Sequence, residues 1–272
     1  MRTRIAADNP YSADRYGFAW EQIPPRGRAH LDLGCYDGQF LDALRPKGIG
    51  RLVGVDVCGP AIERARAKRP GIEFYHMPAD QGLPFPDASF DSVSLLDVLE
   101  HVADQRRLLA EVRRVLAPQG RLIVTVPGSH VFSFLDVGNL KFRFPRLHRW
   151  YYCRNHTRQE YRQRYVDSPD GLVGDVDAAK AWHEHFRRSG LAELLGSADL
   201  AVSAMDGSGL FFRPLSVLMQ LTAWAKPLQR ALRRLRQADS RAFASANVFC
   251  VATPASVEAA VAAAGPGRTA PA

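Results

Sequence analysis

The chain has 272 residues, 46% of them hydrophobic, and a formal net charge of +8. That composition is ordinary for a soluble globular protein, and the length suits one α/β domain with insertions. Because the polar residues 1–11 lack an apolar stretch, we expect no cleavable secretion signal there.

Charge and cysteine content indicate the possible partners and the redox compartment of the protein. Basic residues concentrate in segments 143–164 and 226–241, which fits either an anionic partner or a coding bias toward arginine. The four cysteines form no Cys-x-x-Cys pair. We therefore expect no cysteine zinc site and a reduced, cytoplasmic protein.

Strand and helix patterns alternate along most of the chain. Such alternation predicts a doubly wound, mostly parallel sheet whose ligands bind beyond the carboxyl ends of the strands. The expected strands are 29–33, 51–56, 72–75, 90–96, 121–126, 198–203 and 246–252. The expected helices are 14–22, 38–44, 60–69, 103–116 and 181–196.

Two motifs about twenty residues apart carry most of the chemical information. Asp32 and Gly34 follow an apolar strand and open a turn that ends at Gly38, and a second apolar strand ends in Asp56. Glycines let the backbone approach a ligand closely, and a carboxylate after the second strand accepts hydrogen bonds from ribose hydroxyls. Asp32 would repel a pyrophosphate but attract an ammonium group. The pair of motifs therefore predicts a site for a nucleoside that carries an ammonium group and no phosphate.

At this point the sequence resembles the class I S-adenosylmethionine-dependent methyltransferases with the motif D-x-G-C-G-x-G. Over about residues 28–127, further stretches match the family in order and spacing, namely Ala79–Phe85, Phe90–Val93, Asp97–Val102 and Arg114–Pro127. Two residues depart from the pattern, since Tyr36 and Gln119 replace glycines. Tyr36 would need a different turn or would narrow the site, because a non-glycine residue tolerates positive φ poorly.

The resemblance implies a Rossmann-like, doubly wound, seven-stranded sheet with the last strand antiparallel and a helical or irregular lid. The implied division is a cofactor-binding core at 1–127, an acceptor-binding lid at 128–197, a C-terminal part of the core at 198–254, and a disordered tail at 255–272.

The resemblance also implies a cofactor site for S-adenosylmethionine. Gly34 and Gly38 would shape the turn around the methionine part, Asp32 would hold the ammonium group, and Asp56 would bind both ribose hydroxyls. Asp80 would accept a hydrogen bond from the adenine amino group, and Asp97 would face the sulfonium, although turn capping is an alternative for both. The remaining members of the predicted site are Cys35, Val57 and Gln81.

Histidines are the candidates for a catalytic base. His101 comes first, because imidazole is well suited to take up a proton near neutral pH and this position borders the methyl donor. His130, after the fifth strand, is the second candidate, and His183 or His185 could reach in from the lid. The alternative for His101 is a packing or capping role.

A divalent metal ion is a further hypothesis. Asp97, Glu100 and His101 have the spacing i, i+3 and i+4, which on a helical turn places three side chains on one face. Manganese, iron or zinc would suit these ligands better than magnesium.

The leading function is O-methylation of a small molecule, such as a sugar, a glycoside or a natural-product intermediate of a bacterial biosynthetic pathway. Arg143, Arg146, Arg149 and Arg154 in the lid would bind an anionic or sugar-containing acceptor. Two alternatives stay open: methylation of a membrane-borne prenylated quinone or lipid, and a non-catalytic cofactor-binding regulator. No nucleic-acid partner is expected, because no RNA-binding module is recognisable, and the oligomeric state is not predicted.

The sequence of one segment near the C-terminus is compatible with two structural interpretations. Gly209–Leu235 joins an apolar stretch, too short to span a bilayer, to a basic run. This pattern is typical of an interfacial membrane segment and would give peripheral membrane association, but a helix buried against the sheet is the plainer interpretation.

Overall fold

A seven-stranded sheet forms the centre of the protein, for which we use a computed structural model. The structure describes residues 13–78, 81–129, 144–154, 156–166, 184–222, 224–243 and 246–255. The strand order is β3-β2-β1-β4-β5-β7-β6. The strands are β1 (Ala29–Leu33), β2 (Arg51–Asp56), β3 (Glu73–His76), β4 (Phe90–Leu96), β5 (Leu116–Pro127), β6 (Leu200–Ser208) and β7 (Asn247–Pro254).

Only β7 breaks the parallel direction of this sheet. The pairs among β3, β2, β1, β4 and β5 are parallel, whereas β7 is antiparallel to both β5 and β6. Strand β6 consequently runs in the same direction as β5. The predicted Rossmann-like fold with an antiparallel last strand is therefore confirmed.

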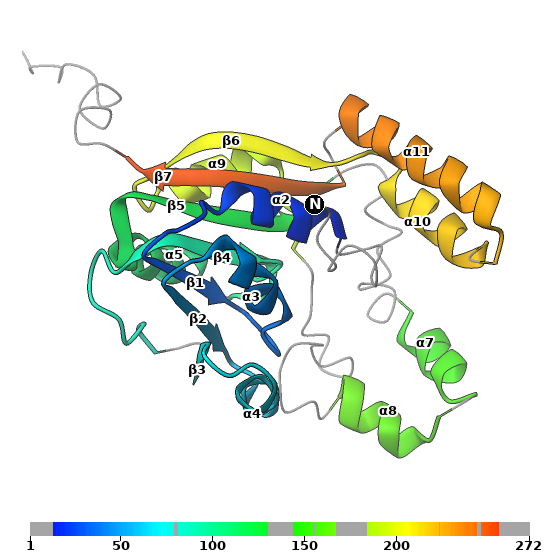
Figure 1. Cartoon of the computed structure of the whole chain (residues 1–272). Helices are drawn as coiled ribbons and strands as arrows, with labels where there is room; N and C mark the ends of the chain where they lie inside the picture. Colours follow the sequence, from blue (N-terminus) through cyan, green and yellow to red (C-terminus); the bar gives the residue numbers. More distant parts are fainter. Residues whose placement is uncertain are drawn as a thin grey trace, which may run out of the picture.

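Helices cover both faces of the sheet (Figure 1). Their bounds are α2 (Ala13–Gln22), α3 (Gln39–Leu44), α4 (Gly59–Lys68), α5 (Gln105–Val115), α7 (Pro145–Tyr152), α8 (Arg158–Tyr165), α9 (Arg188–Gly196), α10 (Phe212–Leu221) and α11 (Lys226–Ala242), with short 3-10 helices η1 (Arg45–Lys47) and η2 (Leu99–His101). Buried side chains of α5 and α9 pack on one face of the sheet, and those of α2, α3 and α4 pack on the other. All five residues of β1 are buried, as expected for a central parallel strand.

Several element boundaries differ from the predicted ones. Helix α5 ends at Val115 and β5 begins directly at Leu116, earlier than the expected 121, because Pro118 cannot continue a helix. The helix expected over 181–196 begins at Arg188. Just before it, Phe186 exchanges backbone hydrogen bonds with Pro127 and Ser129 at the end of β5, so this part of the chain is extended.

The segment Gly209–Leu235 does not form a helix buried against the sheet. It contributes to two helices, α10 and α11, which lie side by side at one end of the molecule (Figure 1). Leu215, Met219 and Leu232 form a small core between them, while Leu221 is 72% exposed. Within the described parts of the chain, no helix is long and apolar enough to cross a membrane.

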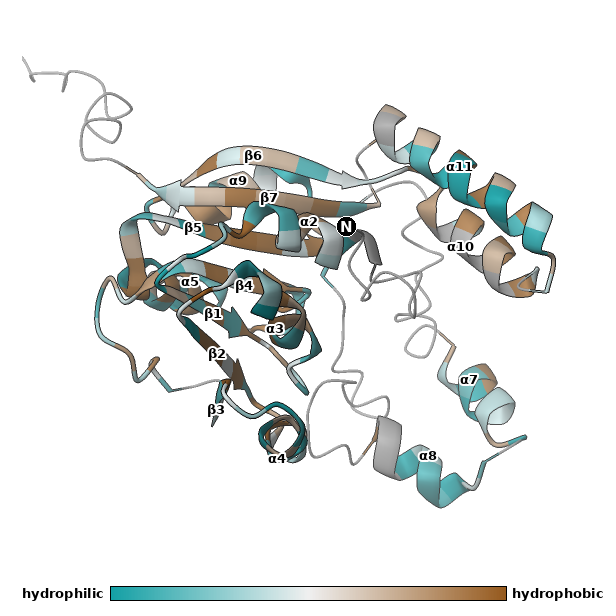
Figure 2. Ribbon diagram, viewed as in Figure 1, coloured by the Kyte–Doolittle hydropathy of each residue, from teal (hydrophilic) through white to brown (hydrophobic). Residues whose placement is uncertain are grey.

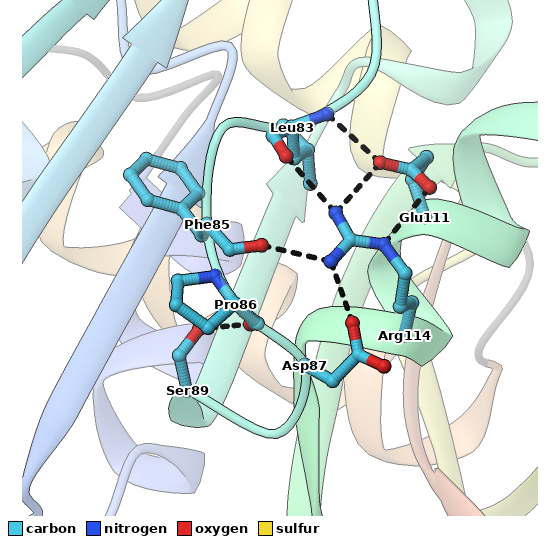
Figure 3. Close-up of polar contacts among 7 residues, drawn as sticks. All are labelled: Leu83, Phe85, Pro86, Asp87, Ser89, Glu111 and Arg114. Carbon is cyan, nitrogen blue, oxygen red and sulfur yellow. Dashed lines mark hydrogen bonds and ion pairs between the residues drawn. The ribbon is translucent and has the colours of Figure 1, made fainter.

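Arg114 fixes the loop between β3 and β4. Its guanidinium donates hydrogen bonds to the carbonyl oxygens of Leu83 and Phe85 at 2.9 and 2.8 Å, and it also bonds the carboxylates of Asp87 and Glu111 (Figure 3). Glu111 in turn accepts a hydrogen bond from the Leu83 amide, and its pKa lies below the ordinary value mainly because of the hydrogen bond from Arg114. The guanidinium of Arg114 thus supplies hydrogen-bond donors to the loop carbonyl oxygens and ties the loop to α5.

Replacing Arg114 should therefore destabilise the fold. We expect Arg114→Met to lower the free energy of unfolding by about 2 kcal/mol, because the Leu83 and Phe85 carbonyls and the Glu111 carboxylate lose a charged donor. Urea denaturation measures this change. The control is Arg106→Met on the exposed side of the same helix, for which we expect a change within about 0.5 kcal/mol. Equal midpoints for the two variants would contradict the role of Arg114.

Candidate active site

The glycine turn after β1 has room only for glycine at two positions. Gly34 and Gly38 both have φ of 77°, a conformation that L side chains rarely adopt. A Cβ atom on Gly34 would overlap the Val98 side chain, and one on Gly38 would lie 2.5 Å from the Phe74 ring. The two glycines therefore determine the path of the backbone between β1 and α3.

Tyr36 keeps the turn although it replaces a glycine. It adopts φ of 48° and donates its backbone N–H to Asp56 Oδ2 at 2.7 Å. The guanidinium of Arg64 lies 5.5 Å from the centre of the Tyr36 ring and donates to its hydroxyl at 3.3 Å. The cost of the left-handed conformation, about 1 kcal/mol, is thus offset by contacts of the same residue.

Asp56 joins the turns after β1 and β2. Besides the Tyr36 amide, its carboxylate accepts the backbone N–H of Cys58 at 2.8 Å on Oδ1. Each carboxylate oxygen carries two lone pairs and uses one of them here. The side chain is buried yet lines a cavity, so a further acceptor site on each oxygen can face a ligand.

A buried chain of hydrogen bonds ends at Asp32. The Ser94 hydroxyl donates to Asp32 Oδ1 at 2.5 Å, and the oxygen of Ser94 lies 3.1 Å from His30 Nε2. His30 Nδ1 lies 2.8 Å from the Ser92 hydroxyl. Because the Ser94 proton is used on Asp32, Nε2 carries the proton of His30 and Nδ1 accepts from Ser92.

Burial shifts the pKa values at both ends of this chain. Burial, with a smaller contribution from the negative charge of Asp56, raises the pKa of Asp32 to about 7 against the hydrogen bond from Ser94. Burial, together with the positive charge of Lys47, lowers the pKa of His30 to about 3, so this histidine stays neutral. A cation beside Asp32 would favour the ionised carboxylate.

Two adjoining cavities lie at the carboxyl ends of the strands. A cavity of about 180 Å³ is lined by Asp32 and Cys35, and one of about 610 Å³ is lined by Asp56, with Gly34 and Tyr36 in the walls of both. The larger cavity also contains three further members of the predicted cofactor site, Val57, Gln81 and Asp97, and the predicted base His101. Of the remaining members, Gly38 shapes the turn, and Asp80 lies outside the described residues.

Asp97 is held by two elements. Its φ is 57°, its backbone N–H donates to the Thr125 carbonyl at 2.9 Å, and its carboxylate accepts the Thr125 hydroxyl at 2.8 Å. The carboxylate also forms an ion pair with Arg15 of α2. These contacts occupy much of its hydrogen-bonding capacity and fix it at the wall of the larger cavity.

The metal hypothesis on Asp97, Glu100 and His101 is wrong for this geometry. The spacing i, i+3 and i+4 would bring them together only on an α-helix. Here Asp97 is in the left-handed conformation and a 3-10 helix begins at Leu99. Among the residues that the structure describes, no group of three His, Cys, Asp or Glu side chains could hold a metal ion.

The four histidines predicted as candidate bases differ in what the structure shows of them. His101 is exposed and lines the larger cavity, whereas His130 and His183 lie outside the described residues. His185 precedes Phe186, whose backbone bonds to Pro127 place this segment beside the end of β5. His101 is thus the predicted base that the described cavity includes.

Helix α2 contributes residues that the sequence did not reveal. Arg15 reaches Asp97, and Tyr16 lines the smaller cavity while its ring stacks on Phe40 at 5.5 Å. No motif marks this helix, because its two contact residues meet the site only after α2 has packed beside the sheet. The apolar walls of the larger cavity, such as Met77 and Leu108, were likewise not predicted.

The carboxylates that line the two cavities fit the groups of S-adenosylmethionine. Asp32 lines the smaller cavity and could bind the ammonium group, and Asp56 lines the larger one with acceptor capacity for ribose hydroxyls. The larger cavity has an apolar wall that suits an adenine ring.

Comparisons with known proteins agree with this site. Residues 31–124 match the family described as a methyltransferase domain. A probable S-adenosylmethionine-dependent methyltransferase of Mycolicibacterium smegmatis is 32% identical over 129 residues, 47% of this chain and 49% of that protein. The demethylmenaquinone methyltransferase of Thermus thermophilus is 39% identical over 124 residues, 44% of this chain and 55% of that protein. The chain thus spans about half the length of these relatives.

Solved structures share the fold over a longer stretch. A methyltransferase in complex with the Haloferax volcanii Trm112 activator has a TM-score of 0.57 at 20% identity, covering 93% of this chain and 95% of that one. At this identity the likeness concerns the fold alone. The match at residues 31–124 and the site built on them both indicate a methyltransferase domain in this part of the chain.

Proposed function

We propose that the protein transfers a methyl group from S-adenosylmethionine to an oxygen atom of a small molecule, such as a sugar, a glycoside or a natural-product intermediate. The observation that carries the proposal is the pair of adjoining cavities, with Asp32 in the smaller one and Asp56 and the exposed His101 in the larger one.

Each of these residues has a separate task. Asp32 binds the ammonium group and Asp56 the ribose hydroxyls, so both set the position of the methyl donor. S-adenosylmethionine supplies the methyl group from its sulfonium sulfur and leaves as S-adenosylhomocysteine. An imidazole nitrogen of His101 takes the proton of the acceptor hydroxyl as the oxygen–carbon bond forms.

Exposed cations near the lid support an anionic or sugar-containing acceptor. Arg146, Arg149 and Arg154 lie on or directly after α7 and are exposed, and Arg154 also lies 5.2 Å from the centre of the Trp150 ring. Such cations suit a phosphate or carboxylate, and the aromatic ring suits the face of a sugar. Arg143 lies outside the described residues.

A membrane-borne acceptor such as a prenylated quinone is the second candidate. It is favoured by the similarity to a demethylmenaquinone methyltransferase and by the apolar lining of the larger cavity. A vesicle-presented acceptor that outperforms its water-soluble analogue would favour this candidate over a soluble sugar.

Loss of Asp56 should weaken cofactor binding strongly. We expect Asp56→Ala to weaken S-adenosylhomocysteine binding at least tenfold in calorimetry, because both ribose contacts and the support of the Tyr36 amide are lost. Glu193→Ala, an exposed acid on α9, is the control and should bind as the wild type does. If the folded Asp56→Ala variant binds equally well, or if the folded wild type does not bind, the proposed function fails.

Cofactor affinity should depend on pH through Asp32. Its pKa of about 7 in the free protein must fall when an ammonium group binds, so affinity is constant above pH 7 and decreases as the pH falls below it. We expect binding about tenfold weaker at pH 6 than at pH 8. Asp32→Asn should bind weakly with little pH dependence, and an unchanged pH profile in this variant would assign the effect to another group.

Loss of His101 should affect chemistry more than binding. We expect His101→Gln to lower kcat about a hundredfold or more, because the general base is missing, while S-adenosylhomocysteine affinity changes less than about threefold. Turnover is measured with an acceptor identified by screening sugars and glycosides. A kcat within about threefold of the wild type would show that His101 has only a structural role.

A further inference from the structure

An apolar surface is exposed at the free end of the helical hairpin α10–α11. We define this hairpin surface by Leu218, Leu221, Trp224, Leu228 and Leu235, which are 42%, 72%, 84%, 41% and 54% exposed. Four of the five lie in the last turn of α10, the connection or the first turn of α11. Large apolar side chains gathered in this way favour contact with an apolar phase over water.

Helix α11, which contributes to this surface, is strongly basic. The sequence of α11 contains six Lys and Arg residues and a single acid, Asp239. Asp239 is buried and accepts the backbone N–H of Phe211, so it does not neutralise the exposed side of the helix. Lys226, Arg230 and Arg233 are exposed and make no ion pair with any residue that the structure describes.

The polar and apolar residues of α11 occupy different sides of the helix. Leu228 and Leu235 are seven positions apart and lie on one side, whereas Arg230, Arg233 and Arg234 project from the remaining circumference. Figure 2 shows hydrophilic residues interleaved with hydrophobic ones along α11, beside the more hydrophobic α10. A basic, amphipathic helix next to exposed Trp and Leu is suited to the interface of an anionic bilayer.

The hairpin stands at the same edge of the sheet as the cofactor cavities. It follows the end of β6, and Ser208 at that end pairs with Asn247, which also pairs with Pro127 at the end of β5. Because β6 runs parallel to β5, its carboxyl end lies at the edge where Gly34, Asp56 and Asp97 also lie. A surface that binds the hairpin would therefore lie on the side of the molecule where the cavities open.

We propose that the α10–α11 hairpin binds the surface of an anionic lipid bilayer, with Leu221 and Trp224 inserted at the interface and the arginines of α11 facing lipid headgroups. This contact is separate from the acceptor chemistry, so it holds for a soluble acceptor as well as a lipid-borne one.

Vesicle sedimentation of the whole chain tests this contact. We expect binding to phosphatidylcholine vesicles that contain about 30% phosphatidylglycerol, little binding to pure phosphatidylcholine, and a marked loss at high salt. The variants Leu221→Ser/Trp224→Ser and Arg230→Gln/Arg233→Gln/Arg234→Gln should each bind at least tenfold more weakly. Both should retain S-adenosylhomocysteine affinity, because none of these residues lines the cavities, so failure here is distinguishable from failure of the proposed function.

Matched control variants distinguish binding through the hairpin surface from nonspecific hydrophobic or electrostatic binding to vesicles. Trp150→Ser removes another exposed tryptophan, and Arg106→Gln/Arg146→Gln/Arg158→Gln removes three exposed arginines elsewhere, so both should sediment almost as the wild type does. The proposal is overturned if the wild type ignores anionic vesicles or if the hairpin variants bind as it does. A dimer in light scattering that the Leu221→Ser/Trp224→Ser variant dissociates, without vesicle binding, would assign the surface to a second copy of the chain instead.

Discussion

The Asp56 carboxylate is the constraint on which the rest of the site depends. Its two oxygens accept the backbone N–H groups of Tyr36 and Cys58, so one side chain fixes the turn after β1 relative to the turn after β2. A buried carboxylate requires such donors, because an unpaired charge in the interior is costly. The bond from the Tyr36 N–H stabilises that residue in its left-handed conformation, and Tyr36 lies in the wall that the two cavities share.

Electrostatics give the site a preference for a cation. Asp32 and Asp56 are both buried, and the charge of Asp56 contributes to the raised pKa of Asp32. The nearby His30 supplies no compensating charge, because burial lowers its pKa to about 3 and keeps it neutral. A ligand with an ammonium group removes this imbalance, which a phosphate would increase. This explains in physical terms why an acid precedes Gly34 where dinucleotide sites have none.

The proposed acceptor-binding residues come from other parts of the chain than the proposed cofactor site. Residues 31–124 carry the family match and nearly all of the residues that line the two cavities. Helices α7 and α8 and the α10–α11 hairpin lie outside that range and present exposed aromatic and basic side chains. The two proposals thus assign the methyl donor to the residues of the family match, and the acceptor and the lipid surface to helices outside it.

The sequence by itself determined the sheet, the glycine turn and the acid after β2, because periodicity and turn residues act over a few neighbouring positions. It did not determine the link from His30 through Ser94 to Asp32, or the ion pair between Arg15 and Asp97. These contacts join residues more than sixty positions apart, and only the pairing of β1 with β4 and the packing of α2 bring them together. The metal hypothesis failed for a local reason: the spacing of its three residues assumed an α-helix, whereas the backbone has a left-handed residue at Asp97 and a 3-10 helix from Leu99.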